Sequence, residues 1–514
     1  MVGGDTLASL LEAKAREIGD RPYVTNVEDG RTYTYAEING RANQTAHLLR
    51  SLAAVPGKPV SILLPNGPEL LFAYFGAMKA GCIAGTVNPD LKPPEIAYIL
   101  GDSESPIVVT DASGSAKIED VRAELPRLHR IVRADEDFER QLNRHPTSVP
   151  RVGILPTDPC EILYTSGTTG HPKGALITHA NFLAAAECFG SELGFDGSLR
   201  ILCFLPLFHT EAQFVSVINS LRVGGSVILA RKFSSHRFWS WIADHRVSVV
   251  SAVPTVFSIM LDMPRDESRD YASLRLMISS AASLPVEVLS AWERRFGVPI
   301  VEGYGLTESA CYATLNPRGR GKPGSVGLPL ACSQLRIVSE HGTPVEPGEP
   351  GEIVLRGWNI FPGYWKNDPA TREAFKGGWF HTGDIGTVGE DGYVVIVDRK
   401  KDMINRGGQK IYPREVDEVL FAHPHVRNAA AVGVPHPILG EEIVAFVELR
   451  DGTTVSPEDI IAFCRANLAD YKVPKEILYV EQIPKGPSGK NLRRKLREDY
   501  AALKGTAGSA AGPS

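Results

Sequence analysis

A loop that combines glycine, hydroxyl and lysine side chains is the first feature with an obvious chemical use. The stretch YTSGTTGHPKG, residues 164–174, contains three glycines, four serine or threonine hydroxyls and one lysine. Glycine lets backbone N–H groups approach an anion closely, hydroxyls add donors, and lysine adds a compact positive charge. The loop follows the apolar run EILY, as a phosphate site at the end of a strand would. The sequence therefore predicts a polyphosphate site here.

Other interpretations of the glycine-rich segments are weaker. A Walker-type loop is disfavoured because Pro172 stands where that motif has the glycine before its lysine. The G-x-G-x-x-G spacing at residues 319–324 follows no apolar strand and is interrupted by Pro323, so we interpret it as an ordinary loop. A flexible surface loop is the remaining alternative for residues 164–174.

Length and composition predict a globular protein of more than one domain. The chain has 514 residues, whereas one hydrophobic core usually supports roughly 250–300. Its residues are 43% hydrophobic and 22% charged, and its net charge of −5 gives no field that would attract nucleic acid or an anionic membrane. The seven cysteines are scattered and no segment resembles a signal peptide or a membrane span, so we expect a reduced, cytoplasmic setting.

Alternating strand and helix patterns predict the elements that position the loop. Residues 60–81 are an apolar run, a turn and a helix-period segment, and looser versions recur at 105–114 and 226–255. This alternation favours an α/β fold with mostly parallel strands. Beyond Gly324, short alternating segments between glycine and proline turns predict a small β-barrel-like subdomain.

A cluster of charges predicts a domain boundary. DRKKD at residues 398–402 is followed by a glycine pair and then by a compact mixture of helices and strands, as at a surface linker. We predict a large N-terminal domain over residues 1–400, a small mobile α+β C-terminal domain over 401–504, and a disordered tail over 505–514. In the C-terminal domain, residues 413–424 have the apolar spacing of an amphipathic helix.

Six motifs occur in one order along nearly the whole chain. They are YTSGTTGHPKGALITHAN from residue 164, PLFH from 206, EGYGLTES from 302, WFHTGDIG from 379, DRKKDMINRGGQKIYPREVD from 398 and PKGPSGK from 484. Together they resemble the adenylate-forming superfamily of acyl-CoA synthetases, the AMP-binding enzymes. The resemblance implies an acid–CoA ligase that uses ATP, Mg²⁺ and coenzyme A. A carboxylate attacks the α-phosphate of ATP, pyrophosphate leaves, and the thiol of coenzyme A then attacks the acyl adenylate.

The same resemblance implies two orientations of the C-terminal domain, one for each half-reaction, with Lys401 as the hinge. It implies a small carboxylic acid as the partner and leaves a homodimer open. The residues that it assigns to the nucleotide are Thr165, Ser166, Gly167, Thr168, Thr169, Gly170, Lys173, Ala281, Ala282, Glu302, Gly303, Tyr304, Gly305, Asp384 and Arg399.

Several of these residues have particular implied roles and ordinary alternatives. Glu308 binds Mg²⁺, for which one carboxylate with phosphate oxygens and water is a usual ligand set, or it is a helix cap. Thr307 contacts the α-phosphate. Tyr304 stacks on adenine or packs in the core, and Asp384 binds ribose or caps a turn. Arg399 is a second ribose or phosphate contact or a solvated charge, and Asp398 beside it replaces a glycine common in the family.

Catalysis and thiol transfer are implied for a second group of residues. Lys490 lies in a Gly/Pro/Ser loop of the mobile domain and supplies positive charge for adenylation. His209 positions the acid where the acyl site meets the pantetheine tunnel, and Gly407 and Gly408 leave that tunnel wide or form a tight turn. Loading of a carrier-protein thiol and a non-catalytic nucleotide-binding protein are the alternative functions.

The acid itself is constrained only by the residues around it. The implied acyl-site residues are His209, Phe214, Ser280, Gly305, Ser309 and Ala310. Glu211 would repel a second carboxylate of the substrate, and no arginine lies in these segments to pair with one. A dicarboxylic acid is therefore disfavoured, because an unpaired buried charge is costly. We therefore expect a mainly apolar monocarboxylic acid.

Overall fold

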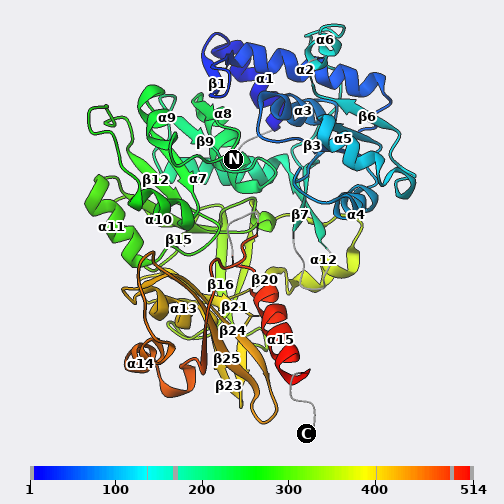
Figure 1. Cartoon of the computed structure of the whole chain (residues 1–514). Helices are drawn as coiled ribbons and strands as arrows, with labels where there is room; N and C mark the ends of the chain where they lie inside the picture. The colour runs from blue at the N-terminus through cyan, green and yellow to red at the C-terminus, as the bar shows by residue number, and fades with distance from the viewer. Residues whose placement is uncertain (1–4, 136, 166–171, 401, 487–490, 510–514) are drawn as a thin grey trace.

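The computed structural model describes residues 5–135, 137–165, 172–400, 402–486 and 491–509. The predicted site residues from Ser166 to Gly170, together with Lys401 and Lys490, lie outside this part of the chain. A large α/β part, coloured blue to green in Figure 1, precedes a smaller C-terminal part coloured gold to red.

Two large sheets form the N-terminal part. The nine-stranded sheet has the order β15 (Leu328–Pro329), β14 (Thr314–Leu315), β13 (Ile300–Tyr304), β12 (Leu276–Ser279), β11 (Val249–Ala252), β9 (Arg200–Cys203), β10 (Ser226–Leu229), β1 (Pro22–Asn26) and β2 (Thr32–Thr34). The seven-stranded sheet has the order β18 (Gly363–Tyr364), β8 (Lys173–Thr178), β7 (Pro159–Thr165), β4 (Ile83–Thr86), β3 (Pro59–Leu63), β5 (Ile107–Thr110) and β6 (Arg130–Arg133). Most neighbouring strands are parallel, as the alternating pattern predicts.

Helices cover both faces of each sheet. The helices of the N-terminal part are α1 (Leu7–Glu17), α2 (Tyr35–Ser51), α3 (Pro68–Lys79), α4 (Pro93–Ser103), α5 (Ala112–Glu119), α6 (Phe138–Leu142), α7 (His179–Glu192), α8 (Asn219–Val223), α9 (Phe238–Asp244), α10 (Pro254–Asp262), α11 (Val286–Phe296) and α12 (Asp368–Ala374). Three short turns of other types are η1 (Arg122–Glu124), the π-helix η2 (Ala212–Ile218) and the 3₁₀ turn η3 (Thr307–Ser309). Because helices cover both faces of the sheet, a central strand such as β3 is buried along its whole length, and its sequence PVSIL is mainly apolar rather than alternating.

Alternate residues of the strands face different cores. In β5, Ile107 and Val109 join the core that the two sheets share with α2, α3, α7 and η2, whereas Val108 packs on the α4 side. In β9, Ile201 faces the shared core, whereas Leu202 packs with α9, α10 and α11. The period of two thus stacks the N-terminal part into layers of helix, sheet, helix, sheet and helix.

The remaining strands form two smaller sheets. One is antiparallel, with the order β16 (Ser333–Val338), β17 (Gly351–Gly357), β20 (Trp379–Val388) and β19 (Phe375–Lys376), and β21 (Val394–Arg399) also pairs with β20. The C-terminal sheet has the order β23 (Gln409–Ile411), β22 (Ile404–Arg406), β25 (Gly440–Leu449) and β24 (Val426–His436), and β26 (Glu476–Tyr479) also pairs with β25. The two sheets separate between Arg399 and Ile404, on either side of the predicted hinge.

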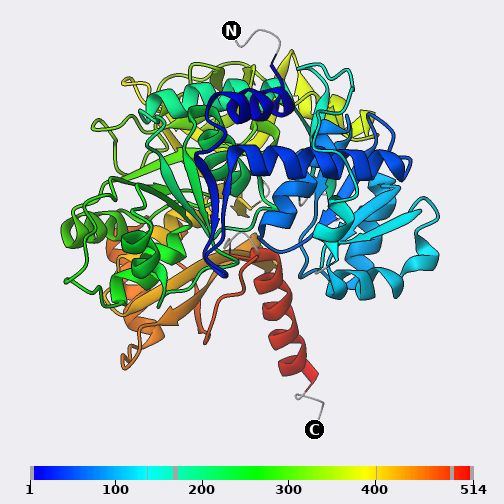
Figure 2. The same cartoon turned by 90° about the horizontal axis from the view of Figure 1, so that it is seen from above.

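The C-terminal helices complete the fold. They are α13 (Pro413–Phe421), α14 (Pro457–Asn467), the 3₁₀ turn η4 (Asp470–Lys472) and α15 (Arg493–Ser509). The amphipathic helix predicted after residue 413 is α13, which buries Val416 and Leu420. The predicted disordered tail was too long, because α15 continues to Ser509 and projects away from the body of the molecule in Figure 2. The good helix formers of α15 lie between residues 495 and 504, and the helix continues from them into the small residues GTAGS at 505–509.

Candidate functional site

The carboxyl ends of four parallel strands meet at one edge of the nine-stranded sheet. Strands β9, β11, β12 and β13 are neighbours and run in parallel. Where they end, the chain continues into the segments that carry His209, Ser280 and Gly305. Open α/β sheets bind ligands at such an edge, and the predicted nucleotide and acyl residues lie there.

The described residues on either side of the predicted phosphate loop, Thr165 and Lys173, belong to the other sheet and contact residues at this edge. Thr165 ends β7, and its Oγ1 donates a hydrogen bond to Glu308 Oε1 at 3.3 Å. Tyr364 donates to the same oxygen at 3.0 Å, and the Lys173 Nζ lies 5.4 Å from the centre of the Tyr364 ring. Two motifs separated by more than a hundred residues in the sequence are therefore adjacent in the structure.

Glu308 fits a magnesium ligand. Its side chain is 8% exposed, and burial raises the pKa of its carboxyl, so a nearby cation would offset the cost of its charge. The hydroxyl oxygens of Thr165 and Tyr364 lie beside the Glu308 carboxylate. Such oxygen ligands suit a hard cation that also binds phosphate oxygens and water. In the described ranges no cluster of three or more His, Cys, Asp or Glu residues could hold a metal by itself, so the cation would need the nucleotide phosphates as ligands.

Tyr304, Asp384 and Arg399 form a connected group. Tyr304 OH donates to Asp384 Oδ2 at 2.7 Å, and Arg399 Nε lies 3.4 Å from Asp384 Oδ1. Strand pairing between β20 and β21 places Asp384 opposite Arg399. Burial and the Asp384 charge raise the pKa of the Tyr304 hydroxyl, so this hydroxyl stays protonated and donates. Three residues predicted to bind the nucleoside are thus brought together.

Backbone strain is concentrated beside these residues. Ala281, Ala310 and Cys311 have φ angles of 67°, 49° and 93°, in the region that non-glycine residues avoid. A Cβ on Gly305 would lie 1.8 Å from the Cys311 carbonyl oxygen, so only glycine fits there. Strain of this kind persists where surrounding structure enforces it, and such sites are often functional.

The PLFH segment contacts the GYGLTE segment directly. Thr210 Oγ1 donates to Thr307 Oγ1 at 3.2 Å, which places His209 beside the residues predicted to contact phosphate. Sequence reasoning did not identify Thr210 or Tyr364 as site residues. The position of Thr210 next to PLFH is a local signal, whereas Tyr364 lies outside every motif used here and carries none.

Two residues predicted to contact ligands, Glu302 and Ser309, make hydrogen bonds to the backbone. Glu302 is buried and accepts a hydrogen bond from the backbone N–H of Leu284 at 3.0 Å, and burial raises its pKa to about 7. Ser309 accepts from the backbone N–H of Leu306 at 2.9 Å and donates to the carbonyl of the same residue. These bonds hold the loops around the site, and direct ligand contact by either side chain stays a prediction. Gly303 lies next to Glu302 in β13, and Ala282 lies in the segment that follows β12.

The acyl-side residues pack around aromatic rings. Phe214, in the π-helix η2, is fully buried, with its ring centre 5.3 Å from that of Phe189 and 6.1 Å from that of Tyr312. Ser280 is also buried, and Glu211 accepts a hydrogen bond from the Ser251 hydroxyl. The predicted residues after His209 and after β12 therefore share one environment that is mostly apolar with a few polar atoms.

The predicted tunnel glycines form a tight turn between β22 and β23. Gly407 and Gly408 have φ angles of 59° and 87°, which explains glycine at both positions. Gly407 donates its N–H to the Leu439 carbonyl at 2.7 Å. The turn interpretation is confirmed, and the width of a thiol tunnel stays a prediction.

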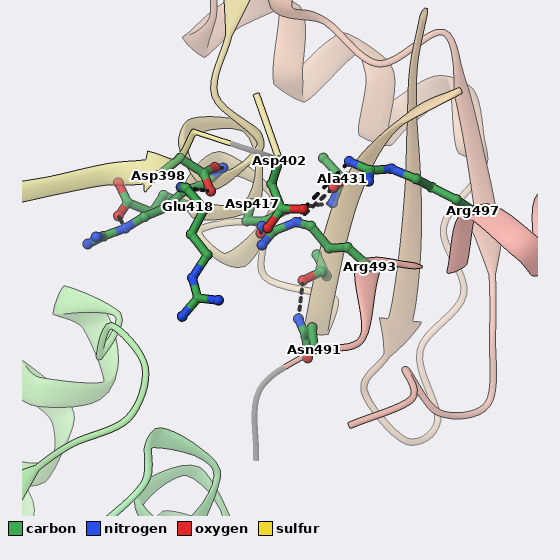
Figure 3. A network of polar contacts seen from close by, with 11 residues as sticks. Asp398, Asp402, Asp417, Glu418, Ala431, Asn491, Arg493 and Arg497 are labelled. Atoms are coloured by element: carbon green, nitrogen blue, oxygen red, sulfur yellow. Dashed lines mark hydrogen bonds and ion pairs between the residues drawn. The ribbon is translucent and has the colours of Figure 1, made fainter. Parts of the chain in front are cut away.

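Asp398 joins the linker to the C-terminal domain. Its Oδ2 accepts the backbone N–H of Arg414 at 2.8 Å, near the start of α13, and its Oδ1 accepts the N–H of Arg399 at 2.7 Å. The Arg414 guanidinium in turn donates to the Ile396 carbonyl at 2.5 Å. The two bonds made by Arg414 cross the predicted hinge, so they depend on the present orientation of the two domains. Figure 3 shows Asp398 beside the C-terminal residues.

A buried ion pair anchors the segment that follows the predicted catalytic loop. Arg493 pairs with Asp417 and donates to the Ala431 carbonyl at 3.1 Å, while Asp417 Oδ1 accepts the N–H of Ala431 at 2.6 Å (Figure 3). Asn491 donates to the Ala429 carbonyl at 3.2 Å. Helix α15 is thus fixed to β24 at the point where the loop ends.

Replacing Asp417 with alanine should destabilise the protein by about 3–5 kcal/mol, because Arg493 would keep a buried charge without its partner. The urea midpoint of unfolding, followed by circular dichroism, measures the loss. Glu498→Ala is the matched control: it breaks the exposed Arg494–Glu498 pair on the same helix, and such pairs contribute roughly 0–1 kcal/mol. Equal midpoints for the two variants would contradict the prediction.

Lys485, just before the predicted catalytic residue, contacts the N-terminal part. Lys485 Nζ donates to Thr255 Oγ1 at 3.1 Å, at the start of α10, which directly follows β11. Lys485 also forms a β-bridge with Asn491, so both described ends of the loop lie together. The two residues that flank the undescribed segment therefore lie beside the start of α10, which follows β11 at the edge of the sheet where the other site residues gather.

The cysteines and the helix lengths bear on the setting in which the chain works. All seven cysteines are free, as their spacing indicates. Within the described residues, no helix is both long and apolar enough to cross a membrane.

Comparison with known proteins gives consistent matches over the whole chain. A family model for the AMP-binding enzyme matches residues 11–365, and one for the AMP-binding enzyme C-terminal domain matches residues 415–490. The sulfoacetate–CoA ligase of Cupriavidus necator is 37% identical over 96% of this chain and 97% of that protein. The oxalate–CoA ligase of Arabidopsis thaliana is 36% identical over 96% and 99%. The crystal structure of the anthranilate CoA ligase AuaEII with anthranoyl-AMP superposes with a TM-score of 0.92, at 30% identity over 98% of this chain and 99% of that one.

Proposed function

The chain belongs to the AMP-binding enzymes of the adenylate-forming acyl-CoA synthetase superfamily and is an AMP-forming acid–CoA ligase, for which we propose a mainly apolar monocarboxylic acid as the substrate. Its co-substrates are ATP and coenzyme A, and its metal ion is Mg²⁺. The enzyme couples pyrophosphate release to acyl-adenylate formation and then transfers the acyl group to the coenzyme A thiol.

One observation carries the proposed acid class. Glu211, two residues after His209, has a buried carboxyl oxygen, and in the described part of the chain no ion pair joins its carboxyl to a cation. A second carboxylate on the substrate would meet this acidic group without a compensating charge, which is costly in a buried environment. The surrounding Phe214, Ala310 and Cys311 side chains are apolar or weakly polar and buried, which suits an apolar acyl group.

The proposed roles follow from the contacts. Tyr304, Asp384 and Arg399 bind adenosine, and Thr165 with Lys173 binds the β- and γ-phosphates. Thr307 contacts the α-phosphate and Glu308 holds Mg²⁺, which neutralises phosphate charge when it is bound. His209 positions the acid, and Lys490 stabilises the charge that develops between the carboxylate and the α-phosphate.

A panel of acids with ATP and coenzyme A tests the proposal. Hexanoate, octanoate, benzoate and cinnamate are compared with oxalate, malonate and sulfoacetate by chromatography of the CoA thioesters and by pyrophosphate release. We expect higher kcat/KM for the first group. Because the relatives named above include ligases of oxalate and sulfoacetate, a dianionic acid is the second candidate, and a preference for the second group would establish it.

Asp398 provides a test of the domain orientation. The bond from Arg414 to Asp398 crosses the predicted hinge and depends on the present orientation, in which Lys485 contacts Thr255 of the N-terminal domain, so we assign this orientation to adenylation. Asp398→Ala should slow adenylation roughly 5- to 30-fold, because a lost hydrogen bond to a charged group costs about 1–2 kcal/mol. Thioester formation from supplied acyl adenylate should not slow.

Single-turnover rates of the two half-reactions measure this effect. Lys400→Ala is the control, because Lys400 lies in the same linker, is exposed and pairs with Glu352 rather than with α13. It should leave the ratio of the two rates unchanged. If Asp398→Ala slows both half-reactions equally, Asp398 has no part in the choice of orientation.

A further inference from the structure

Glu211 has a buried oxygen without a partner. Its Oε1 accepts a hydrogen bond from the Ser251 hydroxyl, whereas Oε2 is inaccessible to solvent and accepts no hydrogen bond from the described residues. Burial raises the pKa of this carboxyl to about 7. Buried carboxyl oxygens normally have partners, because leaving one unpaired costs stability. The unpaired oxygen therefore needs an explanation.

Two neighbouring hydroxyls have the same property. Ser280 and Tyr312 are 3% and 2% exposed, and the hydroxyl of each is buried without a hydrogen bond of normal geometry to the described residues. Both lie near Glu211. The Ser280 N–H donates to the carbonyl of Ala252, the residue after the Ser251 that donates to Glu211. Burial raises the pKa of Glu211 and of Tyr312, and a hydrogen-bonding contact with the Ser280 hydroxyl lowers both in part. We call Glu211, Ser280 and Tyr312 the acyl-side polar cluster. The Ser280 hydroxyl thus serves its two neighbours within the cluster, and the acceptor that is left without a partner is Glu211 Oε2, which a ligand could supply with a donor.

The position of the cluster connects it to the reaction. Glu211 follows Thr210, which donates to Thr307, and Tyr312 follows Thr307 after the two strained residues Ala310 and Cys311. The segments that meet at the nucleotide site thus continue into the cluster. Aromatic rings lie beside it, since the Tyr312 ring centre is 4.7 Å from that of Phe189. An acid whose carboxylate reacts near Thr307 would extend its acyl group along these rings toward the cluster.

Resting on the proposed function, we propose that the acyl-side polar cluster selects acids that carry a hydroxyl or amino group on the acyl portion, distant from the carboxylate. Glu211 Oε2 accepts a hydrogen bond from this group, and the Ser280 and Tyr312 hydroxyls orient it. The rest of the acyl group is apolar. The substrate is therefore a mainly apolar monocarboxylic acid with one hydrogen-bond donor.

Matched acids test this selection. Hexanoate is compared with 6-hydroxyhexanoate and 6-aminohexanoate, and benzoate is compared with its hydroxy and amino derivatives at each ring position. Acid-dependent pyrophosphate release gives kcat/KM, and we expect the best donor-bearing acid to exceed its unsubstituted parent roughly 100-fold or more, since a site built to bind a donor rejects analogues that lack it. In Glu211→Leu this preference should fall to within about threefold or reverse.

A second variant separates charge from hydrogen bonding. Glu211→Gln keeps the size and one acceptor oxygen but removes the charge, so it should retain the preference for a hydroxyl and lose that for an amino group. Glu161→Gln is the matched control, because Glu161 is also a buried glutamate but both of its oxygens accept hydrogen bonds, from Tyr74 and Thr86. It should leave the ranking of the acids unchanged.

The outcomes distinguish this inference from the proposed function. If unsubstituted acids give CoA thioesters and are preferred, or if Glu211→Leu leaves the ranking unchanged, the selection by Glu211 is wrong while the proposed acid class stands. If only dianionic acids react, the acid class itself fails. A soluble Glu211→Gln variant with wild-type circular dichroism and an altered ranking supports the inference even if Glu211→Leu does not fold.

Discussion

Replacing Lys490 with alanine is expected to abolish formation of the acyl adenylate while leaving its conversion to the CoA thioester intact. The lysine charge would lie between the attacking carboxylate and the α-phosphate, where removal of one such group costs roughly 3–4 kcal/mol, or about 10²–10³-fold in rate. Both described ends of its loop lie near the site: Lys485 donates to Thr255 at 3.1 Å and bridges to Asn491. We propose that Lys490 reaches the nucleotide only in this orientation, so the second half-reaction should not need it.

Two assays separate the half-reactions. Acid-dependent exchange of pyrophosphate into ATP reports adenylation, and conversion of synthetic acyl adenylate to CoA thioester reports transfer. Lys495→Ala is a suitable control, because Lys495 lies close in sequence and is paired with Asp499 on an exposed face of α15. It should leave both rates near those of the wild type. Equal loss of both rates in Lys490→Ala would refute the assignment.

Much of the fold could be predicted because local patterns decide it. The strand before the glycine-rich loop is β7, and the amphipathic helix after residue 413 is α13. Apolar runs and their periods encode such elements directly. The length of α15 could not be read in the same way, because its last residues combine helix formers with glycine and the composition alone suggests disorder.

Motifs predict which distant residues lie together, whereas contacts that depend on long-range packing carry no local signal. Thr165 contacts Glu308 and Tyr304 contacts Asp384, pairs separated by 143 and 80 residues that the motifs assign to one site; their roles stay predictions. Tyr364 carries no such signal, since its hydrogen bond to Glu308 depends on β18 pairing with β8. Motif membership also suggested a ligand role for Glu302, although its buried carboxyl serves the Leu284 backbone. A motif therefore identifies the neighbourhood of a site better than the task of each side chain.

Glu308→Gln should reduce adenylation by roughly 100-fold or more, because Mg²⁺ loses the protein charge that holds it while its stabilisation of phosphate charge is worth several kcal/mol. The amide keeps the shape of the side chain, and its oxygen can still accept the hydrogen bonds from Thr165 and Tyr364. The loss should therefore come from weaker metal binding rather than from collapse of the site. Raising the Mg²⁺ concentration should restore part of the rate, with little change in the KM for the acid.

Tyr364→Phe provides the comparison that isolates the charge. It removes one donor to Glu308 Oε1 but leaves the carboxylate, so adenylation should fall only about 2- to 10-fold, as expected for loss of a single hydrogen bond. Its dependence on Mg²⁺ should stay close to that of the wild type. Titrating Mg²⁺ against the rate of pyrophosphate exchange in all three proteins measures both effects. If Glu308→Gln has the same Mg²⁺ dependence as the wild type, Glu308 only supports the loop, because a ligand of the metal cannot lose its charge without weakening metal binding.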